Sequence, residues 1–303
     1  MNDQDFDKFY KNVPQDQKEM LKGFRASHPY KELDINDTCW RYISCGQGSK
    51  TLLFLPGGFM KADMWFYSIL TFQKDYRVIA PNDHTLQGTF EMEDVCNAIV
   101  RILEAEGAEK ATIIGISGGG GVAQYFIQEY PQKVENLVVS HCGIIDAETV
   151  LRLQKQLKLI KILILLKLGR IIKWMVARKS EWSKNYPSSD WVEFRRAYLQ
   201  EHALNIRRET SGRFWEEIFL PSYEKGIESH RNFVFKSEVL QSWPGEILLL
   251  STRDDKWTIG SMQKLKARYP RAKTYIFEQG GHHTIFLSPE EYNSVIRDFL
   301  KGD

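Results

Sequence analysis

Short runs of Val, Ile and Leu, bounded by polar residues and glycines, recur along the chain and predict strands that are buried on both faces. The six runs lie at 51–55, 76–80, 111–116, 134–140, 246–251 and 273–277. Upstream of them, residues 33–35 and 38–43 flank Asn36-Asp37, which predicts a leading hairpin. The pattern therefore predicts a mostly parallel central sheet.

Segments with helical spacing lie between most of these strands. Apolar residues recur at 92, 95, 99, 102 and 103, and acidic residues near the start of that segment favour the positive end of a helix dipole. Near the C-terminus, Ser288, Pro289 and Glu291 have the spacing of an N-cap, a first-turn proline and a capping-box partner. Strands that alternate with helices predict an α/β fold with helices on both faces of the sheet.

About one hundred residues separate the fourth of these strands from the fifth, which is far more than an ordinary connection needs. This insertion lacks β alternation and indicates helices, so we expect it to form a cap. Its apolar bulk includes Trp174, Trp182, Trp191 and Trp215. The expected parts of the chain are a polar, partly helical N-terminal extension at 1–30, a core at 31–145 and 244–303, and the helical cap at 146–243.

Composition and charge limit the class of protein. The chain has 303 residues, of which 43% are hydrophobic, and this is enough for a large buried core. Lys and Arg total 41 against 39 for Asp and Glu, which gives a formal net charge of +2. A nearly neutral chain argues against a dedicated nucleic-acid-binding protein, so we expect no nucleic-acid partner.

The cysteines and the first residues indicate the compartment. The cysteines at 39, 45, 96 and 142 are scattered and form no CxxC pair, which predicts a reducing compartment with no disulfide framework. The first ten residues lack the basic and apolar regions of a signal peptide, and no stretch has 18 uncharged apolar residues. We therefore expect a cytoplasmic protein.

The strongest chemical motif is Gly115-Ile116-Ser117-Gly118-Gly119, which follows one predicted strand and precedes a predicted helix. This is the G-x-S-x-G nucleophile elbow in the context that it requires. A sharp turn from strand to helix holds a serine in a strained conformation with its hydroxyl exposed, and its neighbours must be small. The motif predicts that Ser117 is a nucleophile.

Two backbone donors are expected near this serine. The Gly118 N–H lies at the N-terminus of the predicted helix, where partial positive charge favours an oxyanion. The second donor should come from the loop at 55–59, whose glycines allow close backbone approach. Gly58 is the first choice for that donor, and Phe59 is the next.

A serine hydroxyl needs a base to take its proton and a carboxylate to orient that base. The strand at 246–251 is followed by Asp254 and Asp255, and the strand at 273–277 is followed by His282 and His283. Loops after the strands of open α/β sheets collect catalytic groups. The order serine, aspartate, histidine is typical of α/β hydrolases, although the spacing leaves open which member of each adjacent pair acts.

From about residue 31 to its end, the chain resembles the α/β-hydrolase superfamily. The resemblance implies that Asp255 is the acid and His282, which follows Gly281, is the base. The sequence departs from the family where most members carry His-Gly, because Pro56-Gly57 occupies that place. This change leaves the backbone donor intact but removes a side chain that usually braces the loop.

A closer resemblance is to the maspardin-like group of this superfamily. It rests on residues 24–30 and 33–46, on the Leu55-Pro56 loop, and on residues 268–273. Members of that group are thought to act partly as interaction proteins, and their triad is incomplete. The present sequence departs from them by carrying His282 after Gly281, which favours retained catalysis.

These observations predict a serine hydrolase that cleaves a carboxylic ester or related acyl compound of lipophilic character, without a cofactor or metal. The alternative is a non-catalytic interaction protein that retains the fold. An epoxide hydrolase or dehalogenase of this superfamily would normally need aspartate at position 117. Peptidase, thioesterase and carbon–carbon bond hydrolase activities remain open because they use the same triad, and the oligomeric state is not predicted.

The segment 151–179 in the cap carries nine basic residues and no acid. The nine are Arg152, Lys155, Lys158, Lys161, Lys167, Arg170, Lys173, Arg178 and Lys179. One interpretation is an amphipathic helix that contacts an anionic membrane surface. The other is a cap helix whose lysines simply face water while its apolar side covers the active site.

Overall fold

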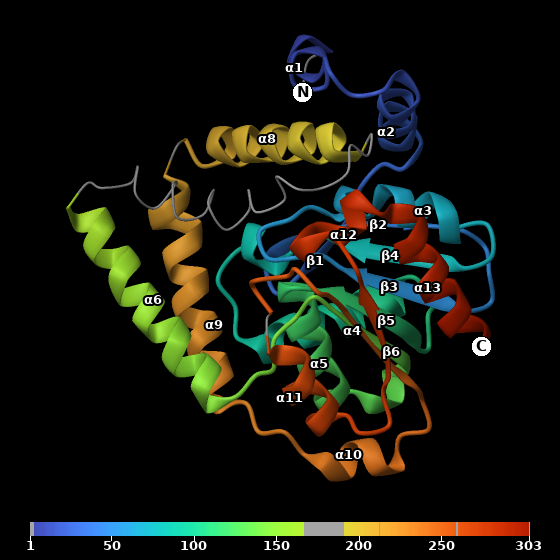
Figure 1. The fold of residues 1–303 in the computed structure, drawn as a ribbon, viewed down its shortest axis with the longest axis vertical. Helices are drawn as coiled ribbons and strands as arrows, with labels where there is room; N and C mark the ends of the chain where they lie inside the picture. Colours follow the sequence, from blue (N-terminus) through green and yellow to red (C-terminus); the bar gives the residue numbers. More distant parts are fainter. Residues whose placement is uncertain (1–2, 167–190, 212, 259, 303) are drawn as a thin grey trace.

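A computed structural model describes residues 3–166, 191–211, 213–258 and 260–302 of the protein. An eight-stranded sheet lies at its centre, with the strand order β1-β2-β4-β3-β5-β6-β7-β8 (Figure 1). The strands are β1 (Lys31–Ile35), β2 (Thr38–Cys45), β3 (Thr51–Leu55), β4 (Arg77–Pro81), β5 (Ala111–Ile116), β6 (Val134–Ser140), β7 (Ile247–Thr252) and β8 (Lys273–Phe277). The hairpin β1–β2 and the pair β2–β4 are antiparallel, and all the other neighbouring pairs are parallel.

The pattern of apolar runs located these strands closely. Four of the six predicted runs have the observed bounds, and the other two strands, β4 and β7, each begin and end one residue later than predicted. The predicted hairpin is also confirmed, because Asn36 and Asp37 both have positive φ between its strands. Two consecutive left-handed residues match the right-handed twist of the flanking strands. The predicted α/β fold with a mostly parallel central sheet is confirmed.

Helices cover both faces of the sheet. The core helices are α3 (Phe66–Phe72), α4 (Met92–Ala105), α5 (Gly118–Glu129), α11 (Ser261–Arg268), α12 (Thr284–Leu287) and α13 (Pro289–Lys301). Short 3-10 turns are η1 (Ala62–Trp65), η2 (His84–Leu86), η3 (Pro131–Lys133) and η5 (Gly281–His283). Alternate residues of β3 divide between two cores, since Leu53 and Leu55 pack with α4 and α5 while Leu52 and Phe54 pack with α3 and α13.

Strand β8 differs from its prediction. Its run of apolar residues predicted burial on both faces, but only Phe277 of the strand is buried, and Ile276 is 42% exposed. The reason is that β8 ends the sheet and has only one neighbouring strand. The predicted capping box of α13 is also wrong, because Ser288 makes no side-chain cap bond and Glu291 accepts a hydrogen bond from Tyr275 instead.

The insertion between β6 and β7 is helical in its described part. Its elements are α6 (Ala147–Leu165), α8 (Trp191–Glu209), the π-helical turn η4 (Trp215–Phe219), α9 (Leu220–Asn232) and α10 (Ser237–Ser242). Figure 1 shows α6 beside α9 at the margin of the molecule. Trp174 and Trp182, which were expected to add apolar bulk here, lie outside the described residues.

The N-terminal residues pack against the rest of the molecule through two helices, α1 (Asp3–Phe9) and α2 (Gln15–Ser27). Their apolar side chains belong to the same core as α3, α8 and α13. These buried side chains are Phe6, Tyr10, Val13, Leu21 and Phe24. The segment at 1–30 was expected to be polar, but its helices contribute an apolar face to this core.

A buried cluster of charges joins α2, the core and the cap helix α8. The Arg25 guanidinium donates to Asp63 in η1 at 2.8 Å and to Glu201 in α8 at 2.8 Å. The Tyr10 hydroxyl donates to Glu201 at 2.6 Å, and the Tyr198 hydroxyl donates to Asp63 at 2.7 Å. We call Arg25, Asp63 and Glu201 the Arg25 cluster. It ties α8 to the N-terminal helices and to the segment that follows β3.

Replacing Arg25 with alanine should leave Asp63 and Glu201 buried without their cation. Removing one partner of a buried ion pair costs about 3–5 kcal/mol, so we expect the free energy of unfolding to fall by about 3 kcal/mol in urea denaturation. The control is Arg101→Ala, which removes an exposed ion pair with Glu104 and should cost less than about 1 kcal/mol. Equal losses in the two variants would contradict a structural role for the cluster.

Candidate active site

Ser117 lies in the sharp turn between β5 and α5. Its φ is +52°, in the left-handed region that non-glycine residues rarely adopt. The turn is tight because β5 and α5 approach closely: a Cβ atom at Gly115 would lie 2.3 Å from the Gly119 carbonyl oxygen. A Cβ at Gly119 would lie 2.3 Å from the Leu55 carbonyl oxygen. Small residues at these positions therefore permit the turn that presents the Ser117 hydroxyl.

The structure brings Ser117 together with His282 and Asp255. The distance from His282 Nε2 to Ser117 Oγ is 2.8 Å, and the distance from His282 Nδ1 to Asp255 Oδ2 is 3.0 Å. A carboxylate only accepts hydrogen bonds, so Nδ1 donates to Asp255 and Nε2 accepts from the serine hydroxyl. The three side chains come from the ends of β5, β7 and β8, which meet at one edge of the parallel sheet.

Asp255 is held as a charged carboxylate. Burial alone would raise its pKa, but the hydrogen bond and charge of His282 and the hydrogen bond from Thr258 outweigh burial and lower the pKa to about 2. Thr258 Oγ1 donates to Asp255 Oδ2 at 2.6 Å, and the Trp257 N–H donates to the other carboxylate oxygen at 2.9 Å. These bonds fix the carboxylate in position to orient the histidine.

The neighbouring residues of each pair have other contacts. Asp254 is exposed, and its carboxylate accepts a hydrogen bond from the Gly281 N–H at 2.9 Å. His283 accepts a hydrogen bond from Arg195 at its Nδ1, at 2.9 Å. The two members of each adjacent pair therefore have different contacts: Asp255 and His282 contact each other, whereas Asp254 and His283 have other partners. Asp254 holds the loop that carries His282.

Gly58 and Gly118 bring their backbones together beside Ser117. A Cβ atom at Gly118 would lie 2.8 Å from the Gly58 nitrogen, so the loop after β3 is packed against the first residue of α5. The Phe59 N–H, the second choice for the loop donor, donates instead to Asp83 Oδ2 at 2.7 Å. Of the two choices for the loop donor, Gly58 therefore has its nitrogen beside Gly118, whereas the Phe59 N–H is bonded to Asp83.

His141 is a further residue of the site whose role sequence analysis did not identify. It is fully buried, its Nε2 lies 2.7 Å from Thr252 Oγ1, and its ring meets that of His282 edge to face at 6.2 Å. Burial lowers the pKa of His141 to about 3, so the ring is neutral at pH 7. Its position directly after β6 was the available signal, because such positions gather at the site edge.

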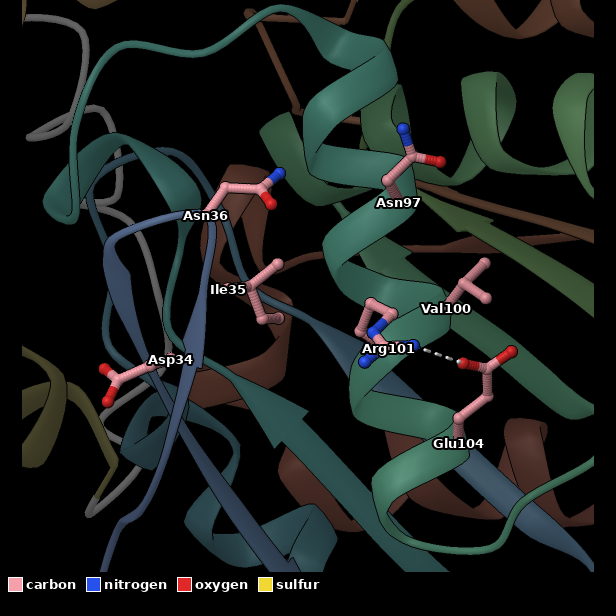
Figure 2. Close-up of a pocket in the computed structure, with 7 residues that line it drawn as sticks. All are labelled: Asp34, Ile35, Asn36, Asn97, Val100, Arg101 and Glu104. Atoms are coloured by element: carbon pink, nitrogen blue, oxygen red, sulfur yellow. Dashed lines mark hydrogen bonds and ion pairs between the residues drawn. The ribbon is translucent and has the colours of Figure 1, made fainter.

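The described residues also contain a pocket of about 540 Å³ away from this site, between the β1–β2 turn and α4 (Figure 2). Its lining residues are Asp34, Ile35, Asn36, Asn97, Val100, Arg101 and Glu104. None of them belongs to the constellation around Ser117, and Arg101 pairs with Glu104 as Figure 2 shows. Within the described ranges, no three His, Cys, Asp or Glu side chains converge as metal ligands.

The serine turn, the ordered histidine and the buried carboxylate on a mostly parallel sheet define the class of α/β hydrolases. The family model of the alpha/beta hydrolase fold matches residues 50–289. The chain belongs to this family and is a hydrolase enzyme of it. In the described part of the chain, every helix is either too short or too polar to cross a bilayer.

Curated relatives include several kinds of hydrolase. The chain is 25% identical to a 2-hydroxy-6-oxo-6-phenylhexa-2,4-dienoate hydrolase of Comamonas testosteroni, over 89% of this chain and 94% of the relative. It is 23% identical to epoxide hydrolase 3 of Xenopus tropicalis, over 94% of this chain and 80% of the relative. A third match, 29% identical, spans only 34% of the dihydrolipoyllysine-residue acetyltransferase component of the acetoin cleaving system of Cupriavidus necator and 40% of this chain.

Solved structures share the fold. A structure of carboxylesterases of Nitrososphaera gargenis has a TM-score of 0.64 and 17% identity, over 90% of this chain and 98% of that chain. A meta-cleavage product hydrolase of Pseudomonas fluorescens IP01 has a TM-score of 0.62 and 18% identity, over 92% of this chain and 99% of that chain. At these identities, the likeness shows the fold alone.

The close approach at the serine turn predicts opposite effects for two glycines of α5. Gly119→Ala should place a methyl group against two backbone carbonyls and lower the free energy of unfolding by about 3 kcal/mol. Gly121→Ala meets no atom within 4 Å and should be neutral or stabilising by up to about 1 kcal/mol, because alanine favours helices. Urea denaturation of both variants checks this, and a stable Gly119→Ala protein would contradict the packing described.

Proposed function

We propose that the protein is a serine hydrolase of carboxylic esters or related acyl compounds. The observation that carries the proposal is the continuous hydrogen-bond chain from Ser117 through His282 to Asp255. A serine hydroxyl becomes an effective nucleophile when a histidine accepts its proton and a carboxylate stabilises the resulting imidazolium. The contacts of His282 with Ser117 and with Asp255 supply both conditions at one edge of the sheet.

In the proposed reaction, Ser117 Oγ attacks the acyl carbon while its proton moves to His282 Nε2. The carbonyl oxygen becomes an oxyanion that accepts hydrogen bonds from the Gly58 and Gly118 N–H groups. The imidazolium then protonates the leaving alcohol, and a covalent acyl-serine remains. Water then attacks the acyl carbon of this ester while its proton moves to His282. The bond from the acyl carbon to Ser117 Oγ breaks as His282 returns the proton to Oγ, and the carboxylic acid leaves.

The surroundings of His282 favour the positive charge that it carries during the reaction. Asp255 is negatively charged beside Nδ1, because its pKa is held at about 2. His141 is buried next to the ring and His283 is half-buried beside it. Desolvation lowers the pKa of both, together with the Arg195 charge for His283, so both stay neutral at pH 7. Asp255 therefore supplies the negative charge opposite the imidazolium, and the two neighbouring histidines carry no positive charge of their own.

The aromatic rings that the cap places beside the oxyanion loop support a substrate with an apolar acyl group. The Phe59 ring follows the oxyanion loop and contacts two rings of the cap, Phe214 at 5.4 Å and Phe219 at 5.5 Å between centroids. Aromatic clusters of this kind offer apolar contact area to a substrate. Ser117 in place of aspartate argues against the epoxide hydrolysis of one relative. Carbon–carbon bond hydrolysis, as named for another relative, remains open because it uses the same triad.

The alternative function, a maspardin-like interaction protein, predicts an unreactive serine. The Ser117–His282 distance of 2.8 Å favours catalysis over this alternative. A fluorophosphonate probe distinguishes the two directly, because it labels only a serine that its base has activated. A folded wild-type protein that neither labels nor hydrolyses esters would favour the interaction protein.

We expect Ser117→Ala to lower kcat/KM for p-nitrophenyl esters by about 10⁴-fold or more, because the nucleophile is lost. Hydrolysis is measured over a panel of esters of increasing acyl length, with fluorophosphonate labelling of both proteins. The preferred chain length reports the depth of the acyl pocket. Undiminished turnover in the variant would remove Ser117 as the nucleophile.

The adjacent aspartates supply a matched control for the assignment of the acid. Asp255→Asn deprives His282 of its charged partner and should lower kcat by about 10³-fold or more. Asp254→Asn removes the same charge one residue away and should have an effect of less than about tenfold, because its carboxylate contacts the Gly281 backbone rather than the histidine. The opposite order of effects would exchange their roles.

We also propose that α6 docks on an anionic membrane surface, on the cytoplasmic side. One side of α6 faces α9, where Lys161 pairs with Glu224 and Leu163 is buried. The outer side exposes large apolar residues at helical spacing: Leu151, Leu159, Ile162, Leu165 and Leu166. Exposed Lys155 and Lys158 lie among them, and residues 151–166 contain no acid. The basic residues at 167–179 lie outside the described residues.

An apolar stripe interleaved with lysines matches the headgroup and acyl boundary of anionic lipids. Binding to vesicles of phosphatidylserine and phosphatidylcholine should exceed binding to phosphatidylcholine alone and should weaken with salt. Lys158→Glu should reduce that binding severalfold, whereas Lys266→Glu, an equal charge change on exposed α11, should leave it unchanged. Salt-independent binding, or equal losses in the two variants, would contradict docking through α6.

A further inference from the structure

The loop that carries the Gly58 N–H is closed by one backbone hydrogen bond of its own, from the Met60 N–H to the Gly57 carbonyl at 3.0 Å. Pro56, Gly57 and Gly58 have no polar side chains, and Pro56 also lacks a backbone donor. The next residue, Phe59, has a φ of +63°, a left-handed conformation that is strained for a bulky side chain. Such a conformation persists only where contacts from elsewhere hold it.

The first such contact comes from the core. Asp83, which follows β4, accepts a hydrogen bond from the Phe59 N–H at 2.7 Å, and the Thr85 hydroxyl donates to the same carboxylate oxygen. The Asp83 N–H in turn donates to the Met60 carbonyl at 2.9 Å. The core thereby fixes the peptide that joins Gly58 to Phe59.

The second contact comes from the cap. His202 in α8 is 2.7 Å from the Phe59 carbonyl oxygen through its Nε2 atom. A carbonyl oxygen only accepts, so Nε2 carries the proton and donates it. Burial lowers the pKa of His202, which favours this neutral form. Both polar groups of the Phe59 backbone are therefore held by side chains, one from the core and one from the cap.

Contacts of Glu201, the residue before His202, hold helix α8 in place. Glu201 accepts from Arg25 and Tyr10, which belong to the N-terminal segment, and Tyr198, one turn earlier, donates to Asp63. Adjacent residues of one helix thus contact the Arg25 cluster and the oxyanion loop. A displacement of α8 would break the His202 bond and the Arg25 cluster together.

We propose that His202 is a positioning residue through which the seated cap holds the Gly58 N–H toward the oxyanion. This inference rests on the proposed function, since it assigns a role within the same reaction. In this arrangement the oxyanion site is complete only when α8 is in place. The cap therefore takes part in catalysis by supporting the oxyanion site.

The test compares two amide side chains at position 202. In glutamine, the amide nitrogen lies at the same number of bonds from Cα as histidine Nε2, so His202→Gln should keep the bond to the Phe59 carbonyl. In His202→Asn the amide is one bond shorter and should not reach. We expect kcat/KM for a p-nitrophenyl ester to fall about tenfold in His202→Asn and to stay within about threefold of wild type in His202→Gln.

A thionoester, in which sulfur replaces the carbonyl oxygen, separates positioning from a general structural effect. Sulfur accepts hydrogen bonds weakly, so the ester-to-thionoester rate ratio reports how much the oxyanion donors contribute. In His202→Asn this ratio should fall by the same factor as the ester rate, and in His202→Gln it should be retained. A purely structural loss would lower both rates equally and leave the ratio unchanged.

The outcomes distinguish this inference from the proposed function. If wild type hydrolyses esters and labels with fluorophosphonate, but the ratio in His202→Asn equals that of wild type, the positioning role is wrong and the serine hydrolase stands. If wild type neither hydrolyses nor labels, the proposed function fails and this inference fails with it. A lowered ratio in His202→Asn that His202→Gln restores supports the cap as part of the oxyanion site.

Discussion

The close packing of the serine turn against the loop after β3 is the contact on which the site depends. Ser117 keeps its left-handed conformation because Gly115 and Gly119 let β5, α5 and that loop approach to distances that a side chain would prevent. The same approach brings the Gly58 nitrogen beside Gly118. One packing contact therefore sets both the position of Ser117 and the position of the Gly58 and Gly118 backbones beside it.

The ionisable side chains of the site are arranged around the imidazole of His282. Asp255 is buried and also accepts several hydrogen bonds. Burial raises its pKa, but the hydrogen bonds and the neighbouring His282 lower the pKa further, so the carboxylate stays ionised. Burial without an acidic hydrogen-bond partner has the opposite consequence for His141, which stays neutral although it lies against the His282 ring. The same burial thus produces a charged group or a neutral one, depending on which partners the fold provides.

The loop after β3 also depends on contacts from the cap and the N-terminal helices. Arg25 joins α2 to Asp63 and to Glu201, and the next residue of α8 reaches the loop beside Ser117. Elements that are distant in sequence therefore support one loop. The outer side of α6 does not contact that loop. Its large apolar residues are exposed, and they belong to the face that we propose docks on a membrane.

The sequence by itself determined the strands, the order of the elements and the choice of Ser117 as the proposed nucleophile, because these follow from local apolar runs and one local motif. Tertiary structure decided the rest. Asp254 and Asp255 are equivalent by spacing, and only the turn after β7 directs Asp255 to His282. The contacts of Phe59 with Asp83 and His202, and the exposure of β8, depend on packing between segments far apart in sequence, which no local pattern encodes.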